Sequence, residues 1–327
     1  MRPRIRGDRM SLAALALGIA LSLSGCAAAA SPAASPSGTA VAETADPASD
    51  PASDPEVAVV AFGDDCDNVF ADPALYLPGA QASPRFPPSG VTTLGGISCG
   101  WNDSAGGGHV LSVYAFPEAA VPADLAQAYT DVTCEPSYDT IDCHLAGAAE
   151  GTWIIVTTSA IDERSEDPHL APALAEALGN ASSSPVPNAA SRSAAWWDVD
   201  CAQLGSDADV AGLFDGAEFY EGYPTGFAPH PVSTFLEEEG VVAWCPWYSY
   251  ERGGIWLNAY PGAGFQWDGV EASAASVAEV DGASAAAYID QYGTSVLVAS
   301  DGTNIVTVQE APVPLEEMAA RLLVALR

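Results

Sequence analysis

The chain has 327 residues and a formal net charge of −33, from 10 basic and 43 acidic side chains. All ten basic residues are Arg, because the sequence contains no Lys. This balance argues against a nucleic-acid partner, because binding phosphates requires clustered Lys or Arg on the protein. It also argues against a polybasic patch that binds membranes. The lack of Lys excludes P-loop phosphate binding and Schiff-base chemistry. Hydrophobic residues make up 49% of the chain, so it is not a disordered acidic polymer, and its length suggests about two domains.

The first 26 residues have the pattern of an export signal. Four Arg precede an apolar run from Ser11 to Leu23, which is too short to span a bilayer. The run ends in Leu23-Ser24-Gly25-Cys26, which resembles the lipobox of bacterial lipoproteins. The resemblance implies that a signal peptidase removes residues 1–25 and that a diacylglycerol group on Cys26 anchors the protein to a membrane. The alternative is an ordinary secretory signal in which the Cys is coincidental.

Residues 26–56 are predicted to be a disordered tether that begins at the lipidated Cys26. They are dominated by Ala, Ser, Pro and Thr, and Pro47-Ala48-Ser49-Asp50 repeats as Pro51-Ala52-Ser53-Asp54. Such a segment lacks the apolar surface that offsets the entropy of folding. As a flexible coil of about 30 residues, its ends would lie roughly 30 Å apart.

Two later stretches, residues 57–178 and 196–327, match each other across a linker at residues 179–195. At an offset of 146 residues, Cys99-Gly100-Trp101 aligns with Cys245-Pro246-Trp247. Upstream, Asp65-Cys66 aligns with Asp200-Cys201. Downstream, Gly151–Ile155 aligns with Gly302–Val306. Because these matches occur in one order, they predict two tandem copies of one domain.

The pattern inside each copy predicts an α+β fold. In the first copy we expect strands at Ile97–Asn102, His109–Phe116 and Gly151–Thr158, then a helix at His169–Leu178. In the second copy we expect a short helix capped by Asp207 and running to Phe214, strands at Val241–Tyr248, Ile255–Tyr260, Thr294–Ala299 and Thr303–Gln309, and a helix at Pro314–Leu326. Short turns join most strands, so each copy should be an antiparallel sheet with its C-terminal helix packed on it.

Cysteine usage predicts three disulfides. With Cys26 assigned to lipid, six Cys remain in an exported chain, where disulfides persist. The repeat favours Cys66–Cys99 in the first copy and Cys201–Cys245 in the second. Cys134 and Cys143 have no counterpart, so they are expected to bond each other. Trp101 and Trp247, two residues after a Cys on a strand, should pack beside their disulfides in the core. The rival interpretation is metal ligation, but no Cys-x-x-Cys occurs.

Together, the Asp-Cys pair, the Cys-x-Trp strand, the Gly-Thr strand and the final Ala/Leu helix resemble a domain family of actinobacterial cell-envelope lipoproteins. Members are described as having unknown function or as extracellular and sensor-like. The resemblance covers each copy, and it implies a disulfide-stapled α+β domain on a membrane tether. It implies no catalytic residue. The tandem copies and the extra pair Cys134–Cys143 depart from the simplest single-domain form.

We find no sequence signature of catalysis, metal binding or a cofactor. The four His (His109, His144, His169 and His230) form no zinc motif and are each expected at the surface, with His169 and His230 in loops or at helix starts. The Gly106-Gly107-Gly108 run lacks the Lys and Ser/Thr of a phosphate loop. Acidic residues cluster around Cys66 without the spacing of a calcium loop, which favours a solvated surface.

The aromatic residues are unevenly distributed. The second copy holds 18 of the 28 Phe, Trp and Tyr residues. Five of them are predicted to form one aromatic face over two neighbouring strands: Trp244, Tyr248, Tyr250, Trp256 and Tyr260. This face is either covered, as in a sheet packed on both sides, or partly exposed to a sugar, lipid or protein partner. Phe219, Tyr220, Tyr223 and Phe227 would form its rim.

The sequence therefore favours a non-enzymatic binding or interaction module, held on the extracytoplasmic face of the cell membrane through lipidated Cys26. Its partner would be an envelope ligand or protein and not a nucleic acid. The alternatives are a structural envelope spacer without a specific pocket, and a hydrolase acting on envelope material.

Overall fold

The computed structural model describes residues 59–103, 109–137, 140–160, 167–214, 220–221, 230–249, 253–291, 293–311 and 313–327. All of these belong to one compact unit of the chain. The predicted signal segment, Cys26 and the predicted tether lie outside the described residues, as do Phe219, Tyr223, Phe227 and Tyr250. None of the helices in the described ranges has the length and apolar character that crossing a bilayer requires.

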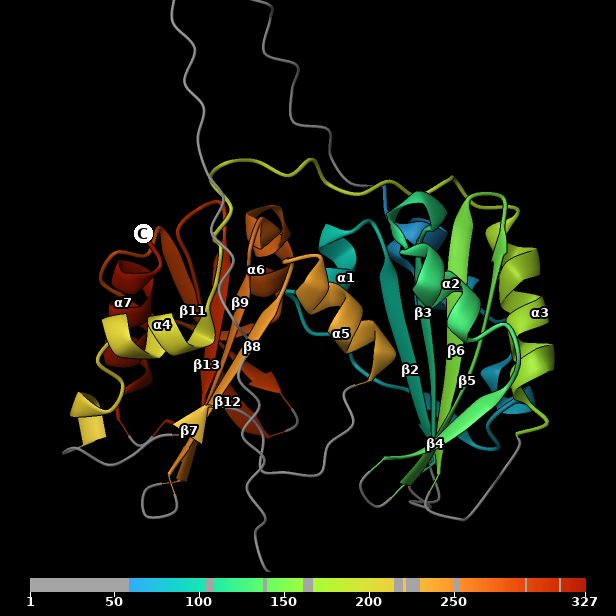
Figure 1. Ribbon diagram of the computed structural model, residues 1–327, viewed down its shortest axis with the longest axis horizontal. Helices are drawn as coiled ribbons and strands as arrows, with labels where there is room; N and C mark the ends of the chain where they lie inside the picture. The colour runs from blue at the N-terminus through green and yellow to red at the C-terminus, as the bar shows by residue number, and fades with distance from the viewer. Residues whose placement is uncertain are drawn as a thin grey trace, which may run out of the picture. The chain divides into compact units, whose positions relative to one another are not determined.

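The first sheet has six antiparallel strands in the order β1-β2-β3-β6-β5-β4 (Figure 1). They are β1 (Ala80–Ala82), β2 (Ile97–Asp103), β3 (Val110–Pro117), β4 (Thr133–Ser137), β5 (Thr140–Ala149) and β6 (Thr152–Ala160). The helices of this copy are α1 (Gly90–Thr93), α2 (Ala123–Ala128) and α3 (Leu170–Ala181). The apolar side of α3, with Leu170, Ala173 and Leu174 buried, packs on β5 and β6.

The second sheet has seven antiparallel strands in the order β10-β11-β12-β13-β9-β8-β7. They are β7 (Tyr220–Glu221), β8 (Ala243–Ser249), β9 (Gly253–Tyr260), β10 (Ala274–Val277), β11 (Ala285–Gln291), β12 (Thr294–Ser300) and β13 (Ile305–Gln309). The helices are α4 (Cys201–Asp207), α5 (Pro231–Glu238), α6 (Trp267–Ala272) and α7 (Leu315–Ala325). The C-terminal helix α7 packs on β12 and β13.

The two sheets share one topology. Read in reverse, the second order begins β7-β8-β9-β13-β12-β11, which matches the first sheet strand for strand and leaves β10 as an additional edge strand. Helix α3 corresponds to α7, because each packs on the two strands that precede it. The predicted α+β fold, with two antiparallel-sheet copies and a C-terminal helix on the sheet, is therefore confirmed.

Two local predictions are wrong. The helix expected to run from an Asp207 cap to Phe214 lies earlier, because α4 ends at Asp207 and only Gly212–Phe214 forms a short 3-10 helix after it. Asp200 caps α4: its carboxylate accepts from the Gln203 backbone N–H at 2.9 Å. The downstream match between copies is also shifted by one residue. Ile154 faces the same core as Cys99, whereas its matched residue Ile305 faces away from the core that holds Cys245. The matched Gly-Thr pairs occupy different places in their turns: Thr152 begins β6, whereas Thr303 lies within the turn before β13.

All three predicted disulfides are present: Cys66–Cys99, Cys134–Cys143 and Cys201–Cys245. Trp101 and Trp247 are each 4% exposed and belong to the apolar cores that contain Cys99 and Cys245. Each of these cores lies on the side of its sheet that α3 or α7 covers. The opposite face of each sheet is not covered by its own C-terminal helix.

On its opposite face the first sheet contacts the second copy. Phe116 of β3 and Phe235 of α5 are edge to face, with ring centroids 5.1 Å apart. Both belong to one apolar cluster with Trp153 and Ile155 of β6. A polar contact reinforces this packing: Gln266 accepts from the Ser89 backbone N–H at 2.9 Å and donates to the Ser89 carbonyl at 2.9 Å.

Candidate binding surfaces

Four of the five predicted aromatic residues lie on one face of the second sheet. Trp244 and Tyr248 of β8, and Trp256 and Tyr260 of β9, alternate with the buried side chains of Cys245 and Leu257. All four aromatic side chains are half-buried. The strand register brings Trp244 opposite Asn258 and Tyr248 opposite Gly254. The structure thus groups these residues as expected from the period of two in a strand.

Packing covers part of this aromatic face. Trp244 and Tyr260 contact the apolar cluster that contains Phe235. Burial raises the pKa of the Tyr260 hydroxyl to about 12, while hydrogen bonds with Asn258 and Thr307 oppose the shift. These two residues stabilise the fold. Tyr248 and Trp256 lie further along the strands, beside Gly254, where an added Cβ would be 3.5 Å from the Trp256 Nε1 atom.

The matching face of the first sheet carries small polar residues instead. At the offset of 146 residues, Ser98 corresponds to Trp244, Gly100 to Pro246 and Asn102 to Tyr248. On the neighbouring strand β3, Ser112 pairs with Gly100 across the sheet. Short side chains therefore occupy the positions at which the second copy places rings.

Above these short side chains lies a groove of about 970 Å³. Its lining residues come from β2, β3 and α1, from the segments before β1 and between β1 and α1, and from the segment at α6. The lining is mixed, and its polar part includes six hydroxyls (Ser83, Ser89, Thr92, Ser98, Ser112 and Ser273) and two amides (Asn102 and Gln266). Two phenyl rings, Phe86 and Phe265, and two prolines, Pro84 and Pro87, complete most of the wall.

The groove is held in shape by hydrogen bonds and one ion pair. Asn102 Nδ2 donates to Ser83 Oγ at 2.8 Å, which joins β2 to the segment after β1. Gln266 Nε2 also donates to Thr93 Oγ1 at 3.1 Å, fixing the α6 side of the groove. The charged residues of the described lining are Asp64 and Arg85, and they form an ion pair with each other. The charge of the lining is thereby balanced.

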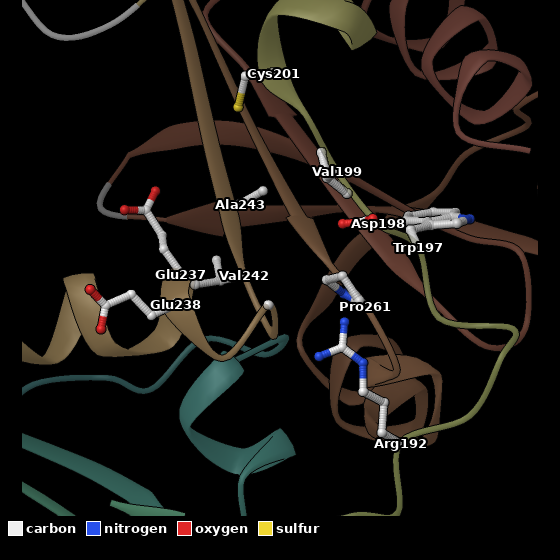
Figure 2. Close-up of a pocket in the computed structure, with 11 residues that line it drawn as sticks. Arg192, Trp197, Asp198, Val199, Cys201, Glu237, Glu238, Val242, Ala243 and Pro261 are labelled. Atoms are coloured by element: carbon white, nitrogen blue, oxygen red, sulfur yellow. The ribbon is translucent and has the colours of Figure 1, made fainter. Parts of the chain in front are cut away.

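A smaller cavity of about 290 Å³ lies beside the Cys201–Cys245 disulfide (Figure 2). In Figure 2, the Arg192 guanidinium points toward Pro261, and the carboxyl groups of Glu237 and Glu238 point away from it. Burial raises the pKa of Glu237, and a hydrogen bond with the Trp244 backbone opposes this shift. Arg192 donates to the Glu239 carbonyl at 3.2 Å. The charged groups here do not converge on one point, and the volume is at the lower limit for ligand sites.

Two histidines meet at the contact between the copies. His144 of β5 is 3% exposed, so the prediction of a surface residue is wrong for it. His144 Nδ1 lies 3.0 Å from Thr157 Oγ1, and His230 Nε2 lies 3.4 Å from the same hydroxyl. His230 and His169 occupy the N-cap positions of α5 and α3, which confirms the prediction of helix starts.

Metal ligation was the rival interpretation for the Cys residues, and the described residues contain no group of three or more His, Cys, Asp or Glu placed to hold a metal ion. The six Cys are engaged in disulfides instead.

The groove on the first sheet was not among the features predicted from the sequence. A signal was present, because β2 and β3 alternate buried apolar residues with Ser98, Gly100, Asn102 and Ser112. Because alternate residues of a strand point to the same face of a sheet, this pattern places the small polar side chains on one face. The contribution of Phe265 and Gln266 had no signal, because it depends on how the second copy contacts the first.

Comparisons with known proteins provide no relative. No family model matches the chain. No curated protein and no solved structure is similar enough to be counted as a match. The resemblance to actinobacterial envelope lipoproteins thus stays a prediction.

Proposed function

We propose that this chain is a lipid-anchored lipoprotein of the extracytoplasmic membrane face, and that its two-copy folded region is a non-enzymatic module that binds a component of the cell envelope. The anchor would be the diacylglycerol on Cys26. The tether of residues 26–56 would let the folded region reach roughly 30 Å as a coil, and about three times as far when extended.

Export is supported by the disulfides. Three disulfides join all six Cys that follow the lipobox. Disulfides persist in oxidising compartments and are rare in the cytosol. An exported chain with a lipobox Cys at its expected cleavage site agrees with this chemistry.

The observation that carries the binding proposal is the 970 Å³ groove on the first sheet. Its volume is near the upper end of the range of roughly 300–1,000 Å³ in which ligand sites fall. Hydroxyl and amide groups of its wall suit hydrogen bonding to a ligand. A structural spacer does not need a groove of this size. The second copy has aromatic residues at the matching positions of its sheet.

Cosedimentation with envelope fragments tests this proposal. The full-length protein, kept in detergent, should sediment with purified cell-wall fragments in a saturable manner. Protein that has been reduced and alkylated serves as the control, because it keeps the composition and charge but loses the three disulfides. Equal sedimentation of the native and reduced proteins would contradict the proposal.

A second arm of this experiment locates the site. The triple variant Trp244→Ala, Tyr248→Ala and Trp256→Ala removes rings from the second copy's aromatic face. If the groove is the site, this variant should sediment like the wild type as long as its circular dichroism spectrum is unchanged. Loss of binding in a folded triple variant would move the site to the aromatic face.

A further inference from the structure

We infer that the groove on the first sheet binds a neutral, polyhydroxylated ligand such as a segment of an uncharged oligosaccharide. The inference rests on the proposed function and adds the chemical class of the ligand. It is carried by the charge, the hydrogen-bonding groups and the exposed ring of the groove.

Charge favours a neutral ligand. The chain carries a net charge of −33, which repels anionic polymers at long range. Within the described lining, Arg85 donates to the Asp64 carbonyl at 2.8 Å and is also paired with its carboxylate. Arg85 is therefore already neutralised by Asp64 and offers no excess positive charge to a phosphate or carboxylate.

Hydrogen-bonding chemistry favours a ligand rich in hydroxyl groups. Hydroxyl side chains both donate and accept, and amide side chains carry one group of each kind. Ser98, Asn102 and Ser112 present these groups from two adjacent strands. A ligand whose own hydroxyls both donate and accept can satisfy such a wall in several registers, whereas a purely apolar or purely anionic ligand cannot.

Phe265 supplies an apolar surface at the edge of the groove. It is 47% exposed, which is unusual for a phenyl ring, and it lies in the short helical segment Ala263–Gln266 (η6). Gln266, the next residue, is anchored to Ser89 and Thr93, so the backbone at Phe265 is fixed relative to the groove. The C–H face of a sugar ring can stack on such a ring while its hydroxyls point to the polar wall.

The duplication limits the number of such sites. The positions that match Ser98 and Asn102 hold Trp244 and Tyr248 in the second copy. Both side chains are half-buried, and their bulk occupies the positions where the first copy has Ser and Asn. One ligand should therefore bind per chain.

Isothermal titration calorimetry on the full-length protein in detergent tests the inference. The probes are soluble glucan, mannan, galactan and arabinan oligosaccharides of four to six sugars, with polygalacturonate oligosaccharides as the anionic comparison. At least one neutral probe should bind with a stoichiometry of one. Phe265→Ala should raise its Kd about tenfold, and Asn102→Ala about two- to tenfold, in line with one neutral hydrogen bond.

The matched control is Leu75→Ala, because Leu75 is also a large exposed apolar side chain, at 64%, but does not line the groove. It should leave the Kd unchanged. Asn102→Tyr, which copies Tyr248 of the second copy, should abolish binding without loss of the folded state. Absence of binding for every neutral probe, preference for the anionic probe, or equal effects of Leu75→Ala and Phe265→Ala would each overturn the inference.

Failure of this inference is distinguishable from failure of the proposed function. If the native protein sediments with envelope fragments while no neutral oligosaccharide binds, the function stands and the ligand class is wrong. If neither binding is observed, the proposed function fails as well.

Discussion

His144 of the first copy and His230 of the second are edge to face, with ring centroids 5.3 Å apart and the Thr157 hydroxyl between their nitrogens. The Val232 backbone N–H donates to His230 Nδ1 at 3.2 Å. In the neutral ring, the proton of His230 is consequently on Nε2 and points to Thr157. The Thr157 hydroxyl can then donate to His144 Nδ1, so both rings are held neutral.

Acidification should weaken the folded state through this pair. Burial and the neighbouring His144 lower the pKa of His230 to about 4, and burial lowers the pKa of His144 as well. The Asp142 carboxylate opposes both shifts, and Glu135 opposes that of His144. Among the described residues, the Tyr114 ring also contacts His230 and the Tyr129 ring contacts His144. Between pH 6.5 and 4 the unfolded chain binds more protons than the folded chain. The contribution of the neutral pair to the free energy of unfolding is therefore fully present above pH 6.5. It falls as the pH drops, by about 3 kcal/mol from His230 alone.

Urea unfolding at pH 7, 6, 5 and 4 measures this loss. In His230→Gln the dependence on pH should be shallower than in the wild type. His169→Gln is the matched control, since His169 also caps a helix but lies outside the pair. Equal slopes for the wild type and His230→Gln would show that the pair does not govern the acid response.

The three disulfides should stabilise the fold unequally. Loops of 33 and 44 residues are closed by Cys66–Cys99 and Cys201–Cys245, but only 9 by Cys134–Cys143. Replacing both members of a pair with Ala should cost about 4 kcal/mol for either long loop and about 2.6 kcal/mol for the short one. Thermal unfolding of the three double variants checks the order. A short-loop variant that is the least stable of the three would contradict it.

Phe235→Ala should destabilise the contact between the two copies. The Phe235 side chain is 2% exposed and packs against Phe116 of the first sheet. Removing the ring leaves a cavity, and the expected cost is about 3–5 kcal/mol in the free energy of unfolding.

Val277→Ala provides the comparison, because Val277 is 85% exposed on the edge strand β10 and should cost less than about 0.5 kcal/mol. Chemical denaturation of both variants checks the prediction. A similar small cost for the two substitutions would mean that α5 does not hold the copies together.

The fold was predictable because duplication left local signals in two places. Cys-x-Trp on a strand occurs in both copies, and each one marks a core-facing register beside a disulfide. The strand match at Ile154 failed because the Gly-Thr pair ends the turn before β6 but lies inside the turn before β13, and the residue pattern does not show this difference. The helix cap failed because Asp200 and Asp207 are both suited to capping, and only the backbone decides between them.

The candidate site was less predictable. The aromatic residues predicted a binding face on the second copy, but Trp244 and Tyr260 pack against the apolar cluster that contains Phe235. The groove depends on the absence of bulk at Ser98 and Gly100, and on Phe265 from a segment more than 150 residues away. Burial of His144 likewise depends on the second copy. Contacts of this kind are set by tertiary packing and leave no periodic signal in the sequence.

The most direct test of the central claim, a lipid-anchored envelope protein, is mass spectrometry of the protein purified from the membranes of producing cells. We expect a chain that begins at Cys26 and an N-terminal fragment that carries the mass of a diacylglycerol group. Cys26→Ser should remove this mass and leave the signal segment uncleaved or the protein released. An unmodified Cys26 in the wild type, or a chain that begins elsewhere, would contradict the account.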